Sequence, residues 1–194
     1  MSLDPAVLQS LTVRIQLNDY VRIMPKEHAA TPLGMGYGKS RFSSPRNTFK
    51  LLYLAQNVKT AVAETIVRDR FEGSSERLVF EEEFSRYCIT GVRSLQPLLL
   101  LDLRHEGASL LGIPTDAVRA RAQAQGRRFS QMLYDQTSLD GSIYMSRITN
   151  RTCVALYDRA VSKLAAETPA TPITTLKSLE SVISDLRIVV LKSP

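Results

Sequence analysis

Two kinds of side chain that often build a chemical site are scarce in this sequence. Its 194 residues include two cysteines, Cys88 and Cys153, and two histidines, His28 and His105. The cysteines lie far apart and form no CxxC pair, so we expect reduced, buried thiols and neither a disulfide framework nor a zinc site. Because the histidines are few and the acidic residues are not clustered, we predict no metal site.

Long apolar runs are absent as well. No stretch is long enough to span a bilayer, and no basic segment followed by an apolar one opens the chain. We therefore expect a cytoplasmic protein without a membrane partner. A composition of 44% hydrophobic and 23% charged residues is typical of a globular protein, and we expect residues 1–194 to form a single domain. The net charge of +6 suits anionic partners such as nucleotides, nucleic acid or an acidic protein.

The spacing of apolar residues and the positions of turn residues predict both strands and helices. The predicted strands are residues 19–25, 49–55, 97–103, the segment after Asp140-Gly141, 153–157 and 186–191, with one or two more within 77–90. The predicted helices are residues 58–70, 114–134 and 176–183. Residues 168–175 are predicted to be a linker, and Glu81-Glu82-Glu83 a solvated strand or loop face. Residues 1–10 are either an arm or a first helical turn.

A long irregular segment, residues 26–48, separates the first two of these strands. Its GYGKS sequence is similar to part of a P-loop, but the Walker pattern needs a glycine where Leu33 stands and a helix directly after it. A loop this long in a compact domain is usually functional or disordered. We expect its glycines to let the backbone approach a ligand while Arg41 points into the site.

A short strand and a helix follow this loop. The strand carries Tyr53, and Asn57 is a suitable N-cap for the helix. On that helix Glu64 lies at the edge of the apolar stripe. The plainer interpretation is an exposed glutamate paired with Arg68 at i+4. The other interpretation of Glu64 is a functional carboxylate close to Arg41 and Tyr53. The loop, strand and helix of residues 34–64 would then bind a phosphorylated, ribose-containing molecule.

A second informative stretch runs from Asp140 to Arg147. Asp-Gly is a turn signal, and the apolar positions after it predict a strand. Ser146 falls at the end of that strand, where side chains commonly enter a cleft. A hydroxyl that caps a loop is the plainer interpretation of Ser146, and a binding role is the other. For Arg22, in the strand before the long loop, a solvated strand residue is the plainer interpretation, and a binding role is the other.

Six short motifs occur in the order found in the RES family, whose name refers to arginine, glutamate and serine residues. They are Tyr20-Val21-Arg22, Ser40-Arg41-Phe42, Leu52-Tyr53-Leu54-Ala55, Ala61-Val62-Ala63-Glu64, Asp140-Gly141-Ser142-Ile143-Tyr144-Met145-Ser146 and the strand 153–157. The chain resembles this family over roughly residues 18–160, with a C-terminal helix and strand in 174–191. Ser43 and Ser142 depart from the asparagine and isoleucine that are usual in the family.

The resemblance implies an α+β fold, with a mixed or antiparallel sheet and flanking helices, similar to that of ADP-ribosyltransferases. It implies a toxin-type enzyme that degrades NAD by cleaving the nicotinamide–ribose bond, as a glycohydrolase or a phosphorylase. An Xre-type antitoxin protein would neutralise it. A mono-ADP-ribosyltransferase acting on a protein target is the alternative. NAD is then a substrate and no cofactor is expected, while inorganic phosphate is a candidate acceptor and a homo-oligomer is left open.

The chemistry of that bond suggests a role for each candidate residue. Cleavage leaves positive charge on the ribose, which the carboxylate of Glu64 would stabilise. The pyrophosphate suits the guanidinium groups of Arg41 and Arg22. Tyr53 would stack on nicotinamide or bind the ribose, and Ser146 would bind the carboxamide or a phosphate oxygen. The predicted catalytic residues are Glu64, Arg41 and Tyr53, and the predicted substrate-binding residues are Arg22, Arg41, Tyr53 and Ser146.

A non-enzymatic module that binds nucleic acid is the competing class of function. The positive charge would suit it, but the aromatic residues are not interleaved with the basic ones and no recognition helix stands out. A serine-hydrolase triad is also not expected, because no histidine lies near Ser146 in the sequence. We therefore predict an enzyme that makes no direct contact with nucleic acid.

Overall fold

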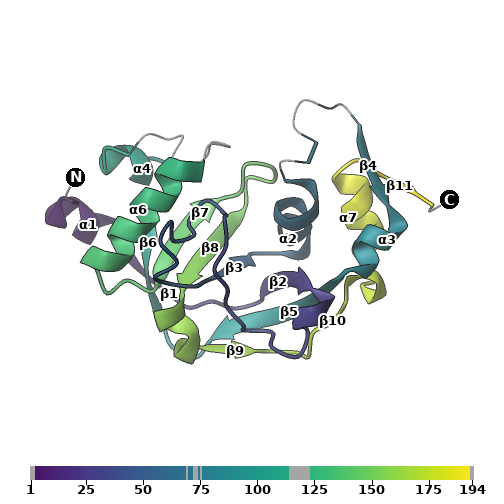
Figure 1. Ribbon diagram of the computed structural model, residues 1–194, viewed down its shortest axis with the longest axis horizontal. Helices are drawn as coiled ribbons and strands as arrows, with labels where there is room; N and C mark the ends of the chain where they lie inside the picture. Colours follow the sequence, from purple (N-terminus) through teal and green to yellow (C-terminus); the bar gives the residue numbers. More distant parts are fainter. Residues whose placement is uncertain (1–2, 69, 72–73, 75, 114–122, 193–194) are drawn as a thin grey trace.

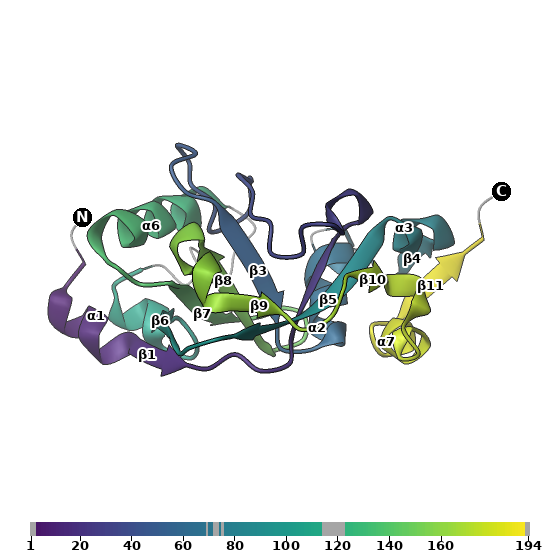
Figure 2. The same cartoon turned by 90° about the horizontal axis from the view of Figure 1, so that it is seen from below.

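The computed structural model describes residues 3–68, 70–71, 74, 76–113 and 123–192 (Figure 1). Its centre is a large curled sheet, and helices lie at both ends of the molecule (Figures 1 and 2). The first described helix (Pro5–Leu11) and the last described strand (Ile188–Leu191) lie at opposite ends of the molecule. In the part of the chain that the structure describes, no helix is long and apolar enough to cross a membrane.

The main sheet is mixed, because one pair of neighbouring strands is parallel and the other pairs are antiparallel. In spatial order its strands are β1 (Thr12–Ile15), β6 (Leu98–Asp102), β7 (Gly141–Met145), β8 (Thr152–Tyr157), β3 (Leu51–Ala55), β2 (Tyr20–Pro25), β5 (Tyr87–Ser94) and β10 (Thr171–Pro172), and β9 (Leu164–Ala166) also pairs with β5. The parallel pair is β6 and β7. The predicted α+β class with a mixed sheet and flanking helices is thus confirmed.

The helices fall into two groups. At one end are α1 (Pro5–Leu11), α4 (Gly107–Leu110) and α6 (Gln123–Gln136). Toward the other end are α2 (Val58–Val62) with its π-helical continuation η2 (Ala63–Val67), α3 (Glu81–Ser85) and α7 (Leu179–Asp185). Short 3-10 turns form η1 (Lys26–His28), η3 (Asp158–Lys163) and η4 (Ile173–Thr175). A small parallel sheet joins β4 (Arg77–Phe80) to β11 (Ile188–Leu191).

Alternation along the strands gives the main sheet two buried faces. On β3, Leu52 and Leu54 belong to one hydrophobic cluster, whereas Leu51 and Ala55 belong to the other, against which Tyr53 packs. We call the face that carries Tyr53 the site face. Burying each leucine of such a cluster contributes roughly 1.5–3 kcal/mol to folding. The two clusters therefore fix which strand residues can reach a site.

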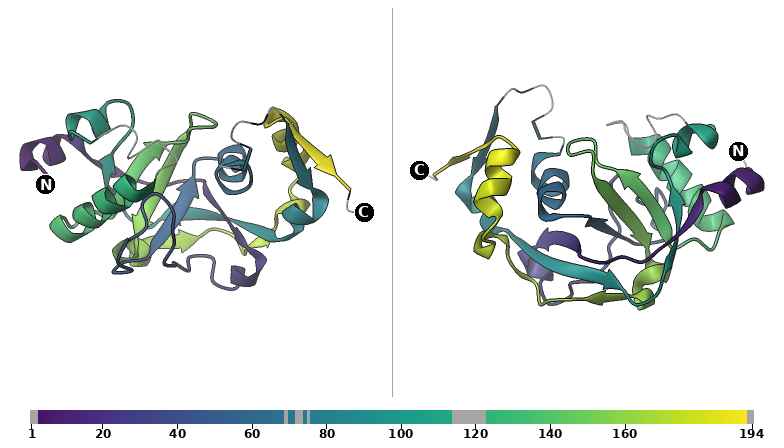
Figure 3. Two further views of the ribbon diagram at one scale, coloured as in Figure 1. Left: turned by 45° about the horizontal axis from the view of Figure 1, so that its top comes forward. Right: turned by 180° about the vertical axis from the view of Figure 1, so that it is seen from behind.

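A third cluster joins the C-terminal elements to the helix that carries Glu64. Val62 of α2 and Ile66 of η2 pack with Val79 of β4, Val182 of α7 and Ile188 of β11. Figure 3 shows α7 standing beside α2 in both views. The C-terminal segment thus supports the back of the α2–η2 helix, with the main sheet on its other side.

Several predicted elements need correction. The helix predicted to reach Arg70 ends at Val67, and Arg68 is already extended. The Glu81-Glu82-Glu83 run starts the short helix α3 instead of forming a strand or loop. The predicted linker of residues 168–175 contains β10 and η4. The predicted helix start at residues 114–116 lies outside the described residues.

Asp140-Gly141 is not the hairpin turn that its sequence suggested. Asp140 is buried, and its carboxylate accepts hydrogen bonds from the amide of Leu99 and the ammonium group of Lys163. Gly141 already belongs to β7. A Cβ atom on Gly141 would lie 2.1 Å from the carbonyl oxygen of Ala155. The glycine is therefore needed for the close approach of β7 and β8.

Candidate active site

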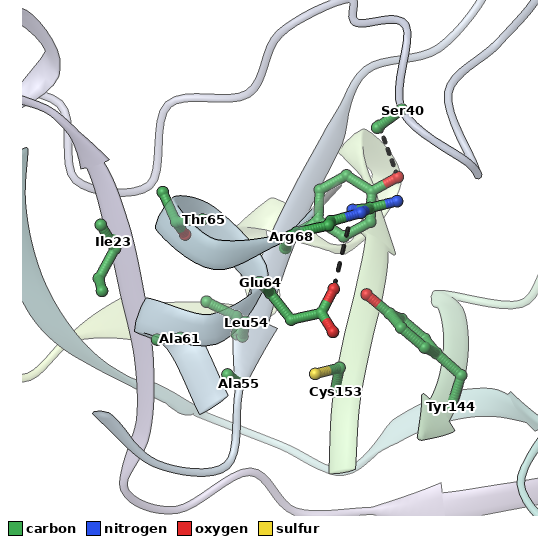
Figure 4. Close-up of a pocket in the computed structure, with 11 residues that line it drawn as sticks. Ile23, Ser40, Leu54, Ala55, Ala61, Glu64, Thr65, Arg68, Tyr144 and Cys153 are labelled. Carbon is green, nitrogen blue, oxygen red and sulfur yellow. Dashed lines mark hydrogen bonds and ion pairs between the residues drawn. The ribbon is translucent and has the colours of Figure 1, made fainter. Parts of the chain in front are cut away.

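A cavity of about 310 Å³ opens on the site face, between the strands and the α2–η2 helix (Figure 4). Its volume is at the lower end of the range of small-molecule sites. The polar side chains that line it are Ser40, Tyr53, Glu64, Thr65, Arg68, Tyr144 and Cys153. In Figure 4 the carboxylate of Glu64 points toward the hydroxyl of Tyr144 and the thiol of Cys153.

The helix that carries Glu64 is fixed at both ends. At its start the side chain of Asn57 accepts the amide of Thr60 at 2.9 Å, so the predicted N-cap is confirmed. At its end the amide of Arg68 donates to the carbonyl of Ala63 at 2.8 Å, which closes a π-type turn. Such turns are rare and are frequent at functional sites. Here the wide turn carries Glu64 in its first part and is followed by Arg68, whose side chain also lines the cavity.

Glu64 is held by a serine that lies 82 residues further along the chain. The Oγ atom of Ser146 donates a 2.7 Å hydrogen bond to Oε1 of Glu64. The same Oγ accepts the amides of Ile148 at 3.2 Å and Thr149 at 3.3 Å, so the turn after β7 orients the hydroxyl. Ser146 is buried. The hydroxyl of Ser146 thus caps a turn and also contacts the candidate carboxylate, a contact that the sequence did not predict, while its role in substrate binding stays a prediction.

The predicted i+4 pair of Glu64 and Arg68 is present, but Glu64 is not an exposed residue. Both side chains are 17% exposed, and NH1 of Arg68 lies 3.8 Å from Oε2 of Glu64. This distance is near the outer limit of an ion pair, and Glu64 lines the cavity, where a ligand could reach its carboxylate. The interpretation of Glu64 as a solvated helix residue is therefore wrong.

Tyr53 ties the long loop to the floor of the cavity. Its hydroxyl lies 2.8 Å from the Oγ of Ser40 and accepts the amide of Phe42 at 3.2 Å. Ser40 in turn lies 2.6 Å from the Oγ of Ser43. Burial raises the pKa of Tyr53, so the phenol stays protonated and can donate a hydrogen bond. Tyr53 and the Ser40–Ser43 turn thus form one hydrogen-bonded rim.

Arg41 sits next to that rim and is almost entirely buried. The residue is 4% exposed, and its Nε atom has no hydrogen-bond partner among the described residues. Burial lowers the pKa of Arg41, and the nearby Arg68 and Arg147 lower it further, while Tyr144 and Glu64 act in the opposite direction. A buried guanidinium beside two others is an unfavourable arrangement unless an anion joins it. This part of the site is therefore suited to a negatively charged group.

Arg22 is not brought to this group. On β2 it alternates with Val21 and Ile23, whose side chains pack on the site face, and Ile23 lines the cavity. Arg22 lies on the opposite face with Tyr20, and its NH1 donates a 2.6 Å hydrogen bond to the carbonyl of Pro32. The predicted five-residue cluster is thus a cluster of four, and Arg22 anchors the long loop instead.

The sequence interpretation did not assign a role to Tyr144 or Cys153. The two are opposite each other in the pairing of β7 and β8, and Tyr144 lies two residues before Ser146, which puts both on one face. This spacing was a signal for Tyr144, whereas only the strand pairing could reveal Cys153. Burial, followed by the negative charge of Glu64, raises the pKa of Cys153 to about 12. Its thiol is thus a neutral wall of the cavity and a poor nucleophile.

The described residues that line the cavity include one carboxylate, that of Glu64. Among the described residues there is no group of three or more His, Cys, Asp or Glu side chains that could hold a metal ion. The cavity lining combines the carboxylate of Glu64 with hydroxyl donors and the guanidinium of Arg68, and the guanidinium of Arg41 lies close enough for both charges to affect its pKa. This set can stabilise a cation at one end and bind an anion at the other.

A family model described as the RES domain matches residues 19–177. The chain therefore belongs to the RES domain family, and the resemblance seen in the sequence is confirmed. "Probable toxin y4kH" of Sinorhizobium fredii (strain NBRC 101917 / NGR234) is 41% identical over 83 residues, which are 42% of this chain and 65% of that protein. The match thus spans slightly less than two thirds of the relative's length.

The fold is also found among solved structures. A chain in the crystal structure of the M. tuberculosis MbcT–MbcA toxin–antitoxin complex superimposes with a TM-score of 0.67. The match covers 96% of this chain and 99% of that chain, at 14% sequence identity. At this identity the similarity establishes a common fold and nothing about the ligand.

Proposed function

We propose that this protein is a toxin-type enzyme that degrades NAD in the cytoplasm by cleaving the nicotinamide–ribose bond. One observation carries the proposal. The carboxylate of Glu64 lines a cavity and is fixed by Ser146, and the buried, incompletely hydrogen-bonded guanidinium of Arg41 lies within electrostatic reach of Glu64 and of Arg68, which also lines the cavity. Cleavage of the nicotinamide–ribose bond of a dinucleotide leaves a ribosyl cation, which a carboxylate stabilises. The pyrophosphate of the same substrate needs an anion-binding group close by.

The proposed reaction begins with heterolysis of the bond between the ribose carbon and the nicotinamide nitrogen. The electron pair leaves with neutral nicotinamide, and the ribose ring carries the positive charge. Glu64 stabilises this charge, and its hydrogen bond from Ser146 keeps one carboxylate oxygen in place. Water or inorganic phosphate then bonds to the ribose carbon, and with water one proton is released.

The remaining groups of the site position the substrate. Arg41 and Arg68 bind the pyrophosphate, whose two negative charges relieve the repulsion between the two guanidinium groups. Tyr53 and Ser40 form the rim that contacts the ribose or nicotinamide. Arg22, on the other face of β2, acts only by holding the loop that presents Arg41.

The test is to incubate the purified protein with NAD and to measure nicotinamide by chromatography, in buffers with and without phosphate. We expect release in at least one buffer. Glu64→Gln should reduce it by roughly 10²–10⁴-fold, the range of a lost charge-stabilising or acid–base group. Glu82→Gln, at an exposed position of α3, is the matched control and should leave the rate unchanged. Absence of release in both buffers would sink the proposal.

Labelled NAD separates hydrolysis or phosphorolysis from protein modification. Free ADP-ribose or its phosphate should carry the label, whereas label on a protein would indicate a mono-ADP-ribosyltransferase. We also propose an Xre-type antitoxin as the neutralising partner. The toxin–antitoxin complex that contains the similar fold supports an antitoxin partner, and the Xre type rests on the family resemblance. A co-purified complex should not consume NAD, and one that does would contradict this part.

A further inference from the structure

A second cavity lies behind the candidate active site. It has a volume of about 370 Å³ and lies between α2, the end of α7, the start of β4 and the turn after β7. In Figures 1 and 3, α7 and β4 stand on the side of α2 that faces away from the main sheet. The ionisable side chains that line the cavity are Lys59, Arg77, Asp185 and Arg187. Three cations thus face one carboxylate.

Two of these cations are held in place by their partners. Nζ of Lys59 lies 2.9 Å from Oδ2 of Asp185, and NH1 of Arg77 donates a 2.6 Å hydrogen bond to the carbonyl of Leu186. These bonds fix the two side chains and use only part of their donors, since an ammonium group has three N–H donors and a guanidinium has five. The remaining donors are available to a ligand.

Arg187, the third cation, has an unusual backbone conformation. Its φ angle is +52°, in the left-handed region that non-glycine residues seldom adopt. Its side chain is exposed, while Leu186 and Ile188 on either side are buried. The strained turn therefore lets the chain place Arg187 at the cavity between two residues anchored in the core.

We propose that this cavity binds a phosphate group, either inorganic phosphate or a phosphomonoester. Its four ionisable side chains carry a net charge of +2, from three cations and one carboxylate. Planar guanidinium groups and an ammonium group are the donors that phosphate oxygens prefer. Thr149 also lines the cavity, and its hydroxyl can donate to a phosphate oxygen when the hydroxyl of Thr60 is the donor in the hydrogen bond that the two share.

The cavity is positioned to act on the candidate active site. Ile148 and Thr149 line it, and their amides are the two that orient the Oγ of Ser146 toward Glu64. The Oγ1 of Thr149 also lies 2.9 Å from that of Thr60, on the helix that leads to Glu64. A phosphate bound here would thus order the turn that fixes Ser146.

The experiment is a titration of ¹⁵N-labelled protein with inorganic phosphate, followed by amide chemical shifts. We expect saturable shifts at Lys59, Ile148, Thr149 and Arg187. Glycerol phosphate tests the phosphomonoester source and should act at the same amides if the site accepts an ester. Sodium chloride at matched ionic strength should not reproduce the shifts, and the proposal is overturned if it does.

Variants locate the site. Arg187→Asn removes the guanidinium and keeps a residue that tolerates the left-handed region, and Lys59→Met keeps the alkyl stem. Each should weaken phosphate binding by at least roughly tenfold, equivalent to about 1.4 kcal/mol. Arg128→Met, at an exposed position of α6, is the matched control.

Arg41→Met separates this cavity from the candidate active site. It should leave the shifts of Ile148 and Thr149 intact, because Arg41 does not line the second cavity. If Arg41→Met abolishes them, or if both cavity variants bind phosphate as well as the wild type, the proposal is overturned. Neither outcome depends on NAD cleavage, so the proposed function and this inference fail separately.

Discussion

The Oγ atom of Ser146 and the Oε1 atom of Glu64 lie 2.7 Å apart, although 82 residues separate them in the sequence. Glu64 comes from the π-helical end of a helix, and Ser146 from the first position after β7. The helix and the strand are independent elements of the sequence. Only the strand order, which places β3 and β8 between β2 and β7, brings their ends together.

This relationship predicts a specific result for Ser146→Ala. The change removes the donor to Glu64 and the acceptor of the amides of Ile148 and Thr149. Leaving two partly buried amides without an acceptor should lower the free energy of unfolding by about 1–3 kcal/mol. Nicotinamide release should fall by roughly tenfold to a hundredfold, because Glu64 loses the hydrogen bond that orients it. A small misplacement of a catalytic group commonly has an effect of this size. Denaturant unfolding and steady-state kinetics measure the two effects.

The control for Ser146→Ala is Ser184→Ala, at an exposed position of α7. It should change neither quantity. A Ser146→Ala variant with wild-type kinetics and reduced stability would show that the hydroxyl only caps its turn.

Tyr53→Phe tests whether the hydroxyl of Tyr53 holds the long loop. The change removes its contacts with the Oγ of Ser40 and the amide of Phe42. We expect a rise in the KM for NAD of about threefold to tenfold and a stability loss of about 1 kcal/mol, as for one neutral hydrogen bond. Tyr37→Phe is the control, because Tyr37 is 56% exposed. If Tyr53→Phe and Tyr37→Phe have equal KM values for NAD, the hydroxyl of Tyr53 does not contribute to substrate binding.

The faces of the strands could be predicted from the sequence, and the site depends on them. Alternation alone places Tyr144 and Ser146 together, and places Arg22 opposite to Val21 and Ile23. Which of these faces carries the site could not be predicted, because it depends on the pairing of β2 with β3 and β5. Such pairing joins distant segments and leaves no local signal. The expectation that Arg22 joins the site failed for this reason.

The missed elements have a similar physical cause. The π-turn after Val62 depends on how Ile66 packs against the C-terminal elements, and helical periodicity does not encode that packing. The strand β10 has two residues, Thr171 and Pro172, and is defined by its partner β5. The strand β8 was predicted correctly because its own short, continuous apolar run specifies it.

Cys153 gives a prediction for the pH dependence of stability. Burial and Glu64 raise the pKa of its thiol from 9.0 to about 12. Between these values the folded state keeps a proton that the unfolded state has lost, so stability is complete below pH 9 and falls as the pH rises. The thiol of Cys153 should therefore lower the free energy of unfolding by on the order of 1 kcal/mol between pH 8 and 10, and Cys153→Ala should remove this contribution. Urea unfolding of wild type and Cys153→Ala at pH 8 and pH 10 measures this contribution. An equal decrease in the free energy of unfolding of the two proteins would contradict the prediction.

The same shift predicts that the thiol of Cys153 is unreactive in the folded protein. Thiol reagents attack the thiolate, which is scarce at pH 8 when the pKa is about 12. Cys88 is buried as well. We expect no rapid reaction with a disulfide reagent in native buffer and two reactive thiols in denaturant. Rapid native modification that Cys153→Ala abolishes would show that the cavity wall is open to solvent.

Arg41 is a residue whose loss should damage binding without damaging the fold. Its guanidinium is buried, its Nε has no partner among the described residues, and Arg68 repels it. An apolar side chain of similar length at this position avoids the cost of burying an incompletely hydrogen-bonded charge. We therefore expect Arg41→Met to leave the free energy of unfolding unchanged or to raise it by about 1 kcal/mol. The KM for NAD should rise by roughly tenfold or more, because a charge-assisted contact to the pyrophosphate is lost.

Two comparisons make the Arg41 result decisive. Arg128→Met, on the exposed side of α6, should change neither stability nor KM. Nicotinamide riboside, which has no pyrophosphate, should be cleaved equally by wild type and Arg41→Met, because the lost contact is to a group that this substrate lacks. If Arg41→Met instead unfolds the protein and leaves the KM of the folded fraction unchanged, Arg41 is a structural residue. The buried charge would then have a partner in the fold, and the pyrophosphate would have to be bound by other groups.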